Sequence, residues 1–228
     1  MRKIGIIGGL GPEATIDYYR TIINECRVQT QGDVPEIVLY SLNLKDFPDI
    51  DDKDAIVKWL LDGIKAVHHA GADFAIISAN TPHIVFDRLK PLSPLPLLSI
   101  VEETGKAIKE LGALTVGLFG TKVTMSSDFY QRVFDTYSVK IVVPLPEEQD
   151  YINHKISSEL MFNNIVEETR NGLLKIAERM VHDDGIQALI LGCTELPLIL
   201  TKDYLGIHFL NTTRIHALAA IRYSLTGE

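Results

Sequence analysis

The feature that most constrains the fold is an apolar pattern that occurs twice along the chain. The glycine-bearing segment 4–9 recurs as 116–121, at an offset of 112 residues. The later segment 71–80 recurs as 185–194, at an offset of 114 residues. Because both segments recur in the same order, the simplest account is an internal duplication of one folding unit.

Each recurring segment has the character of a buried strand. Short apolar runs bounded by glycine are typical of parallel strands that are covered on both faces. Apolar residues elsewhere recur at helical spacing, as at Ile56, Leu60 and Ile64. We therefore predict an α/β fold of two pseudo-symmetric Rossmann-like halves, with mainly parallel sheets and the active site in the cleft between them. The first half is predicted to hold residues 1–100 plus 209–228, and the second half residues 101–208.

The element boundaries follow from the positions of glycine, proline and polar turns. Strands are predicted at 4–7, 36–42, 73–78, 116–121, 140–143, 187–191 and 207–210, with a further strand that ends near residue 100. Helices are predicted at 12–27, 54–70, 102–111, 127–137, 150–169, 173–183 and 212–224. The proline-bearing segment 89–97 is predicted to be a loop.

Composition limits the classes of function. The chain has 228 residues and a formal net charge of −8, which opposes a broad nucleic-acid-binding surface because such surfaces are basic. Apolar runs stay shorter than the roughly 18 residues of a membrane span. The run that follows Met1–Lys3 is too short for a signal peptide. We expect a cytoplasmic protein with no nucleic-acid or membrane partner.

The sequence gives no support to common cofactor sites. Cys26 and Cys193 are the only cysteines, and in a reducing cytoplasm we expect both to be free thiols. No close Cys/His spacing indicates structural zinc. The adjacent residues His68 and His69 point to different helix faces, which disfavours a metal pair. The glycines of segment 5–11 do not form the G-x-G-x-x-G pattern of a dinucleotide site.

A tetrapeptide with three reactive or polar side chains follows the last duplicated strand. Gly192-Cys193-Thr194-Glu195 places a thiol, a hydroxyl and a carboxylate at the carboxyl end of a buried strand, where open α/β sheets bind ligands. A cysteine in this position is either an inert core residue or a reactive group. The preceding glycine permits close approach to the backbone and the following threonine can donate a hydrogen bond, which favours the reactive role. Glu195 is predicted either to cap the next helix or to position Thr194.

Four motifs together resemble the signatures of the aspartate/glutamate racemase superfamily, most nearly its aspartate racemase-like branch. They extend over nearly the whole chain and are Gly8-Gly9-Leu10-Gly11-Pro12-Glu13, Asn80-Thr81-Pro82-His83, Gly120-Thr121-Lys122-Val123-Thr124-Met125 and Gly192-Cys193-Thr194-Glu195. The resemblance implies racemisation without pyridoxal phosphate or metal, a small amino-acid or carboxylate substrate, and a homodimer. In that family two cysteines flank the α-carbon of the substrate. One thiolate removes the proton, and the opposite thiol returns a proton to the other face.

The resemblance also implies the residues of the site. Cys193 is the implied acid/base in the second half, and a thiolate can serve as a base if neighbouring donors lower its pKa. Asparagine, threonine and backbone donors hold the α-carboxylate in the family. The implied substrate-binding residues are Gly9, Leu10, Asn80, Thr81, Thr121, Thr124, Thr194 and Glu195.

The sequence departs from this scheme at the other cysteine. The duplication aligns Ala79 with Cys193, and Ala79 stands where the family usually has its first cysteine. A methyl group carries no proton, and the hydroxyl of Thr81 is too weak an acid to replace a thiol unaided. Three interpretations stay open: a natural branch with altered or one-sided proton transfer, an engineered inactivating substitution, or a non-catalytic carboxylate-binding protein. A single-cysteine decarboxylase-type lyase, as in the arylmalonate decarboxylases of this fold, is a further alternative.

The segment after the second predicted strand bears on the substrate. Aspartate racemases of this family often carry an arginine there for the distal carboxylate, whereas segment 47–53 has none. Lys53 or Lys122 can take that role, although a solvated surface lysine is the simpler interpretation of each, so aspartate specificity is not predicted. The acidic part of the segment is interpreted as a solvated loop or as part of a mobile lid. His83 and His216 are interpreted as hydrogen-bonded structural residues.

Overall fold

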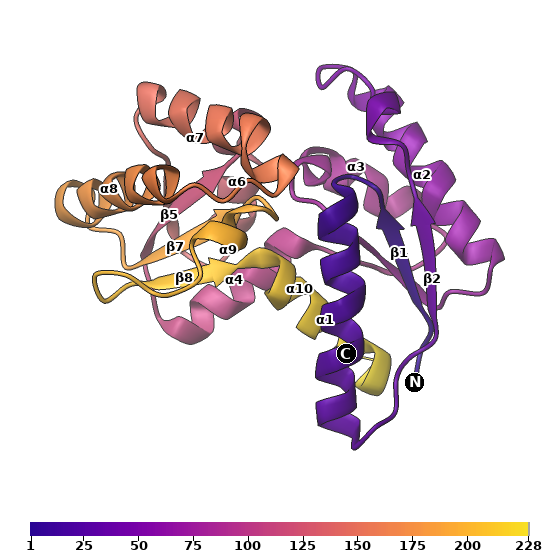
Figure 1. Cartoon of the computed structure of the whole chain (residues 1–228). Helices are drawn as coiled ribbons and strands as arrows, with labels where there is room; N and C mark the ends of the chain where they lie inside the picture. Colours follow the sequence, from indigo (N-terminus) through magenta and orange to yellow (C-terminus); the bar gives the residue numbers. More distant parts are fainter. Residues whose placement is uncertain (228) are drawn as a thin grey trace. The chain divides into compact units, whose positions relative to one another are not determined.

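A computed structural model of the chain describes residues 1–227 and has an α/β fold that divides into two compact units (Figure 1). One unit is Met1–Glu103 together with the chain from Thr213 onward, and the other is Thr104–Thr212. These divisions fall inside helix α4 (Ile100–Leu111) and at the start of helix α10 (Thr212–Thr226). The predicted division at residue 209 would cut strand β8 (His208–Asn211), which pairs with β7 in the second sheet.

The first unit is built on a parallel sheet with the strand order β2-β1-β3-β4. Its strands are β1 (Ile4–Gly8), β2 (Ile37–Ser41), β3 (Phe74–Ile77) and β4 (Leu97–Leu98). Its helical segments before α4 are α1 (Pro12–Thr30), η1 (Leu44–Asp46), α2 (Lys53–His69), η2 (Thr81–Val85), α3 (Phe86–Leu89) and η3 (Lys90–Leu92). Every residue of β1 and β3 is buried, as their continuous apolar sequences predict.

The second unit repeats this topology in the strand order β6-β5-β7-β8, again all parallel. Its remaining strands are β5 (Thr115–Gly120), β6 (Lys140–Val142) and β7 (Ala188–Gly192). The helical segments that follow α4 are α5 (Lys122–Ser126), α6 (Phe129–Asp135), α7 (Pro146–Ser158), η4 (Leu160–Phe162), α8 (Glu167–Asp183) and α9 (Leu196–Ile199).

The register of the central strands matches the sequence repeat. Ile7 of β1 pairs with Ile77 of β3 in the first sheet, and Phe119 of β5 pairs with Leu191 of β7 in the second. The first members of these pairs differ by 112 residues and the second members by 114, the two offsets of the repeat. The internal duplication inferred from sequence is therefore confirmed in strand order and in register.

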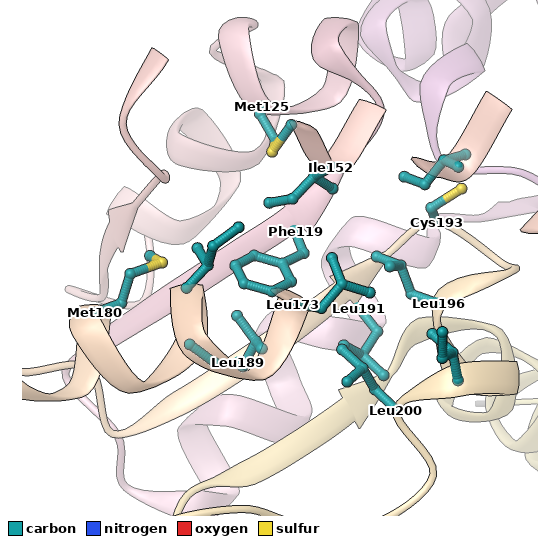
Figure 2. Packing of buried hydrophobic residues seen from close by; sticks show 14 of the residues in the cluster. Phe119, Met125, Ile152, Leu173, Met180, Leu189, Leu191, Cys193, Leu196 and Leu200 are labelled. Atoms are coloured by element: carbon teal, nitrogen blue, oxygen red, sulfur yellow. The ribbon is translucent and has the colours of Figure 1, made fainter. Parts of the chain in front are cut away.

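A hydrophobic core cluster of the second unit covers the face of the sheet on which Phe119, Leu189 and Leu191 lie. Phe119 lies at its centre, packed against α7 and α8 through residues such as Ile152 and Leu173 (Figure 2). Cys193 belongs to the same buried cluster, and Figure 2 shows it at one margin, with Met180 at the opposite margin. The thiol is thus held by close packing at the edge of this apolar core.

Helix α1 starts directly after the glycine turn that ends β1. Gly11 has a φ of 125°, and Pro12 occupies the first helical position, where its missing N–H costs no hydrogen bond. Tyr18, Ile22 and Cys26 recur every four residues and are all buried against β1 and β3, which accounts for the helix and places Cys26 in the core.

The predicted helix 150–169 is wrong. Helix α7 ends at Ser158, and the chain passes through η4 to Asn163, whose φ of 56° interrupts any helix. Helix α8 then begins at Glu167, earlier than the predicted start at 173. Gly172 lies inside α8, where a Cβ would stand 2.1 Å from the hydroxyl oxygen of Tyr151, so close packing explains this glycine.

Several shorter elements also differ from prediction. The predicted loop 89–97 includes the end of α3 and the 3₁₀ turn η3, because proline is tolerated in the first turn of such segments. Strand β4 has two residues, and α4 begins directly afterwards at Ile100. The predicted helix 127–137 is reduced to α6, and the short helix α5 precedes it.

Candidate functional site

The glycine turn after β1 forms one part of the candidate site in the first unit. Gly9 has a φ of 81°, and a Cβ built on it would lie 1.9 Å from the carbonyl oxygen of Leu42. The amide of Gly9 donates to the hydroxyl oxygen of Thr15 at 2.9 Å. Only glycine fits this backbone, because the left-handed conformation and the approach of Leu42 both exclude a side chain. The predicted site residue Leu10 follows in the same turn and is partly exposed.

The turn is linked by hydroxyl groups to the tip of β3. Thr15 and Ser78 share a hydrogen bond of 3.2 Å between their hydroxyl oxygens, and Ser78 donates to the carbonyl oxygen of Ile7. The next residues, Ala79 and Asn80, are 8% and 4% exposed. The structure therefore brings the predicted residues of the first unit, Gly9, Leu10, Ala79, Asn80 and Thr81, to the carboxyl ends of neighbouring strands.

His83 fixes the backbone just beyond these residues. Its Nδ1 lies 2.9 Å from the carbonyl oxygen of Ala79, and its Nε2 lies 3.2 Å from the amide nitrogen of Ile100. A carbonyl can only accept and an amide can only donate, so the ring is neutral with its proton on Nδ1. Burial lowers the pKa of His83 to about 3, which agrees with this state.

His216 has the complementary tautomer. Its Nε2 lies 3.1 Å from the carbonyl oxygen of Leu98 and must donate, so its Nδ1 accepts from the hydroxyl of Tyr18 at 3.0 Å. Burial lowers the pKa of His216 to about 4. The prediction that His83 and His216 are hydrogen-bonded structural residues is confirmed, because both ring nitrogens of each have a partner within the protein.

The second unit carries its reactive groups at the tip of β7. The thiol of Cys193 donates to Oε2 of Glu195 at 2.9 Å, and the hydroxyl of Thr194 donates to the same oxygen at 2.9 Å. Cys193 and Glu195 are each 8% exposed. Glu195 precedes α9 without a capping hydrogen bond from its side chain, so of the two predicted roles the structure supports the one that positions Thr194.

The environment of Cys193 holds its sulfur as a thiol. Burial raises the pKa of Cys193 well above its usual value, and the negative charge of Glu195 together with the hydrogen bond to Glu195 raises it further. The condition that neighbouring donors lower this pKa is therefore not met in this structure. The hydrogen bonds from backbone amides that act in that direction are outweighed by desolvation and by the adjacent carboxylate.

Two threonines stand at the neighbouring tip of β5. Thr121 caps helix α5 by accepting a hydrogen bond from the amide of Thr124, and the two hydroxyl oxygens are 3.0 Å apart. Lys122, between them, pairs with Asp150 of α7. The strand pairing of β5 with β7 brings Thr121 and Thr124 to the same edge of the sheet as Cys193, Thr194 and Glu195.

Sequence reasoning missed the buried hydroxyls of Thr15 and Ser78. A signal was available for each, because Ser78 is a polar residue at the end of an apolar strand and Thr15 lies one turn after the glycines. Both cysteines are free thiols, as predicted. Within residues 1–227, no group of three or more His, Cys, Asp or Glu side chains could hold a metal ion, and no helix is long and apolar enough to cross a membrane.

Comparisons with known proteins agree with this architecture. A family model described as Asp/Glu/Hydantoin racemase matches residues 7–220. A broad specificity amino-acid racemase from Bacillus subtilis (strain 168) is 32% identical over 135 residues, which cover 57% of this chain and 59% of that relative, less than two thirds of its length.

Solved structures match over almost the whole chain. An aspartate racemase homologue from Pyrococcus horikoshii OT3 is 34% identical with a TM-score of 0.88, and the match covers 99% of this chain and 100% of that one. The aspartate racemase of Picrophilus torridus is 25% identical with a TM-score of 0.81, covering 98% and 94%.

Proposed function

The chain belongs to the Asp/Glu/Hydantoin racemase family, and from that membership we propose that it is an amino-acid isomerase of the racemase type that needs no pyridoxal phosphate or metal ion. The similarity to a broad specificity amino-acid racemase and to aspartate racemases supports this class of reaction. The acid/base group in the proposal is Cys193.

The contact between Cys193 and Glu195 is the observation that carries the proposal. A buried thiol whose proton points at a carboxylate oxygen 2.9 Å away has a ready acceptor for that proton. Thr194 donates to the same oxygen and fixes the carboxylate in place. In the proposed reaction the thiol passes its proton to Glu195, and the resulting thiolate abstracts the α-proton of the amino acid.

The methyl group of Ala79 determines what this chemistry can accomplish. In the two-thiol mechanism of the family a second cysteine returns a proton to the other face of the α-carbon. Ala79 holds no proton to return. We therefore expect Cys193 to remove and return the proton on one face, so that exchange of the α-proton is faster than inversion.

The remaining predicted residues bind the substrate in this proposal. Asn80, Thr81, Thr121 and Thr124 are proposed to supply hydrogen bonds to the α-carboxylate, as the family resemblance implies. Gly9 and Leu10 line the site in this proposal through the turn after β1, whose backbone conformation only glycine at position 9 allows.

Incubation of the protein with the separate L- and D-enantiomers of single amino acids in heavy water tests the proposal. Incorporation of deuterium at Cα of one enantiomer, measured by NMR, combined with slower appearance of the opposite enantiomer by chiral chromatography is the expected result. Added chelator is expected to leave the rate unchanged, and the purified protein is expected to lack a pyridoxal absorption band. Absence of exchange with every amino acid would refute the proposed isomerase.

The protonated state of Cys193 favours a second candidate, a decarboxylase-type lyase. A single thiol that rests protonated is suited to donate a proton to an enediolate formed when a malonate loses carbon dioxide. Release of carbon dioxide from aryl- or alkylmalonates would favour the lyase, whereas amino-acid exchange without such release would favour the isomerase.

We further propose a cytoplasmic homodimer, because the family resemblance implies a dimer. A molar mass near 51 kDa by light scattering, about twice the chain mass of 25.4 kDa, is the expected result. A mass that stays at the single-chain value at micromolar concentration would count against the dimer.

A further inference from the structure

The segment that follows β2, residues 42–53, lies against the glycine turn of the first unit. The amide of Leu42 donates to the carbonyl oxygen of Gly8 at 2.9 Å, and the carbonyl oxygen of Leu42 packs against Gly9. The strand order β2-β1-β3-β4 places the tip of β1 between the tips of β2 and β3. A ligand held at the turn and at the tip of β3 therefore has this segment as its neighbour beyond β1.

The apolar side chains around this position are only partly buried. Leu10, Leu42, Phe47 and Ile50 pack against the core of the first unit and keep part of their surface exposed. The ring of Phe47 packs edge-on against Trp59, with ring centroids 5.4 Å apart, which fixes its orientation. The contacts that a substrate side chain would find here are hydrocarbon and aromatic.

The charges in the same region oppose an anionic side chain. Residues 42–54 hold five aspartates and two lysines. The ammonium group of Lys53 donates to the carbonyl oxygen of Ile50, within the segment itself. Lys122, the other cation that the sequence offers for a distal carboxylate, is paired with Asp150. Arg88 pairs with Asp54, and Lys45 is an exposed cation of the segment. Five aspartates against these cations and Lys53 still leave an excess of negative charge, so a substrate carboxylate beside the segment would lose hydration among like charges.

Taking the proposed amino-acid isomerase as the basis, we propose that its substrates are amino acids with an apolar side chain, and that Phe47 and Ile50 determine this specificity. Aspartate and glutamate are disfavoured by at least about tenfold in kcat/KM relative to leucine or methionine. This factor corresponds to the least that leaving one charged group without a partner ordinarily costs.

Two measurements on the whole protein test the specificity. Rates of α-proton exchange are compared for both enantiomers of leucine, methionine, aspartate, glutamate and lysine, and binding of the same amino acids is measured by calorimetry. Preference for leucine and methionine in the exchange rates supports the inference. Preference for aspartate, glutamate or lysine in the exchange rates overturns it. Binding of leucine or methionine without any α-proton exchange would refute the proposed isomerase but would still support the apolar specificity. If no amino acid binds, both proposals are refuted.

Ile50→Arg provides the residue-level test. A guanidinium group forms paired hydrogen bonds with a carboxylate, so the variant is expected to shift the ratio of aspartate to leucine binding by about tenfold toward aspartate. Val28→Arg is the matched control, because Val28 is 80% exposed near the far end of α1 and receives the same charge away from the strand tips. An equal shift in both variants, or none in Ile50→Arg, would refute the assignment of Ile50.

Discussion

Replacing Gly9 by alanine should destabilise the protein far more than an equivalent change elsewhere. Gly9 has a φ of 81°, and a Cβ at this position would lie 1.9 Å from the carbonyl oxygen of Leu42. Gly112 has a similar φ of 74°, but a Cβ there would meet no atom within 4 Å. The two substitutions therefore share the same backbone strain and differ in the steric clash.

The expected magnitudes follow from this comparison. An alanine in the left-handed region costs about 1–2 kcal/mol, which is the whole effect expected for Gly112→Ala. At Gly9 the Cβ must also move away from a backbone oxygen that cannot rotate aside, and overpacking of this kind adds about 1–3 kcal/mol. We expect Gly9→Ala to lower the free energy of unfolding by about 2–5 kcal/mol in total.

Thermal and urea denaturation of the two variants measure this difference. For a chain of this length each kcal/mol lowers Tm by about 2–4 °C. If Gly9→Ala and Gly112→Ala lower the free energy of unfolding by the same amount, the carbonyl oxygen of Leu42 does not exclude a side chain at position 9. That result would refute the claim that only glycine fits this turn.

Three further predictions concern the chemistry of the site and its histidines. Cys193→Ser should abolish α-proton exchange, measured by NMR in heavy water, because an alcohol is rarely ionised near neutral pH; retained exchange would exclude Cys193 as the base. Ala79→Cys should raise the rate of inversion, measured by chiral chromatography, with Ala113→Cys as a buried control; equal rates in both would refute the assignment of residue 79. The free energy of unfolding should fall as the pH drops from about 6.5 towards about 4, because the unfolded chain binds protons that folded His83 and His216 do not. His216→Gln should reduce that slope in urea denaturation measured at several pH values, and an unchanged slope would contradict the buried neutral state of His216.

The fold was largely predictable because it depends on patterns that are local in sequence. Apolar runs of four to six residues identify β1, β3, β5 and β7, and the repeat carries the register between them. The helix boundaries near Asn163 were not predictable, because a single residue in the left-handed region interrupts a stretch whose apolar spacing remains compatible with a helix. Its effect depends on backbone geometry that the spacing does not encode.

The candidate site was predictable in location but not in protonation. Strand-tip position and the order of the motifs place Cys193 and Ala79 at equivalent points of the two sheets. The pKa of the thiol depends on how deeply it is buried and on where the Glu195 carboxylate points, and neither follows from adjacency in sequence. The same holds for His83, whose neutral tautomer is set by contacts with Ala79 and with the distant Ile100.

The carboxyl ends of β3 and β7 occupy equivalent positions in the two sheets, but only the end of β7 carries a side chain that can transfer a proton. This difference bears on which of the two candidate reactions takes place. Cys193 carries a thiol that donates to the carboxylate of Glu195. Ala79 carries only a methyl group, and its backbone carbonyl oxygen accepts a hydrogen bond from His83. In the proposed isomerase the thiol passes its proton to Glu195 before the thiolate can act, so Glu195→Gln should abolish α-proton exchange. A lyase uses the protonated thiol as its acid, so the same variant should still release carbon dioxide from a malonate. Retained α-proton exchange in Glu195→Gln would exclude Glu195 as the acceptor of the thiol proton.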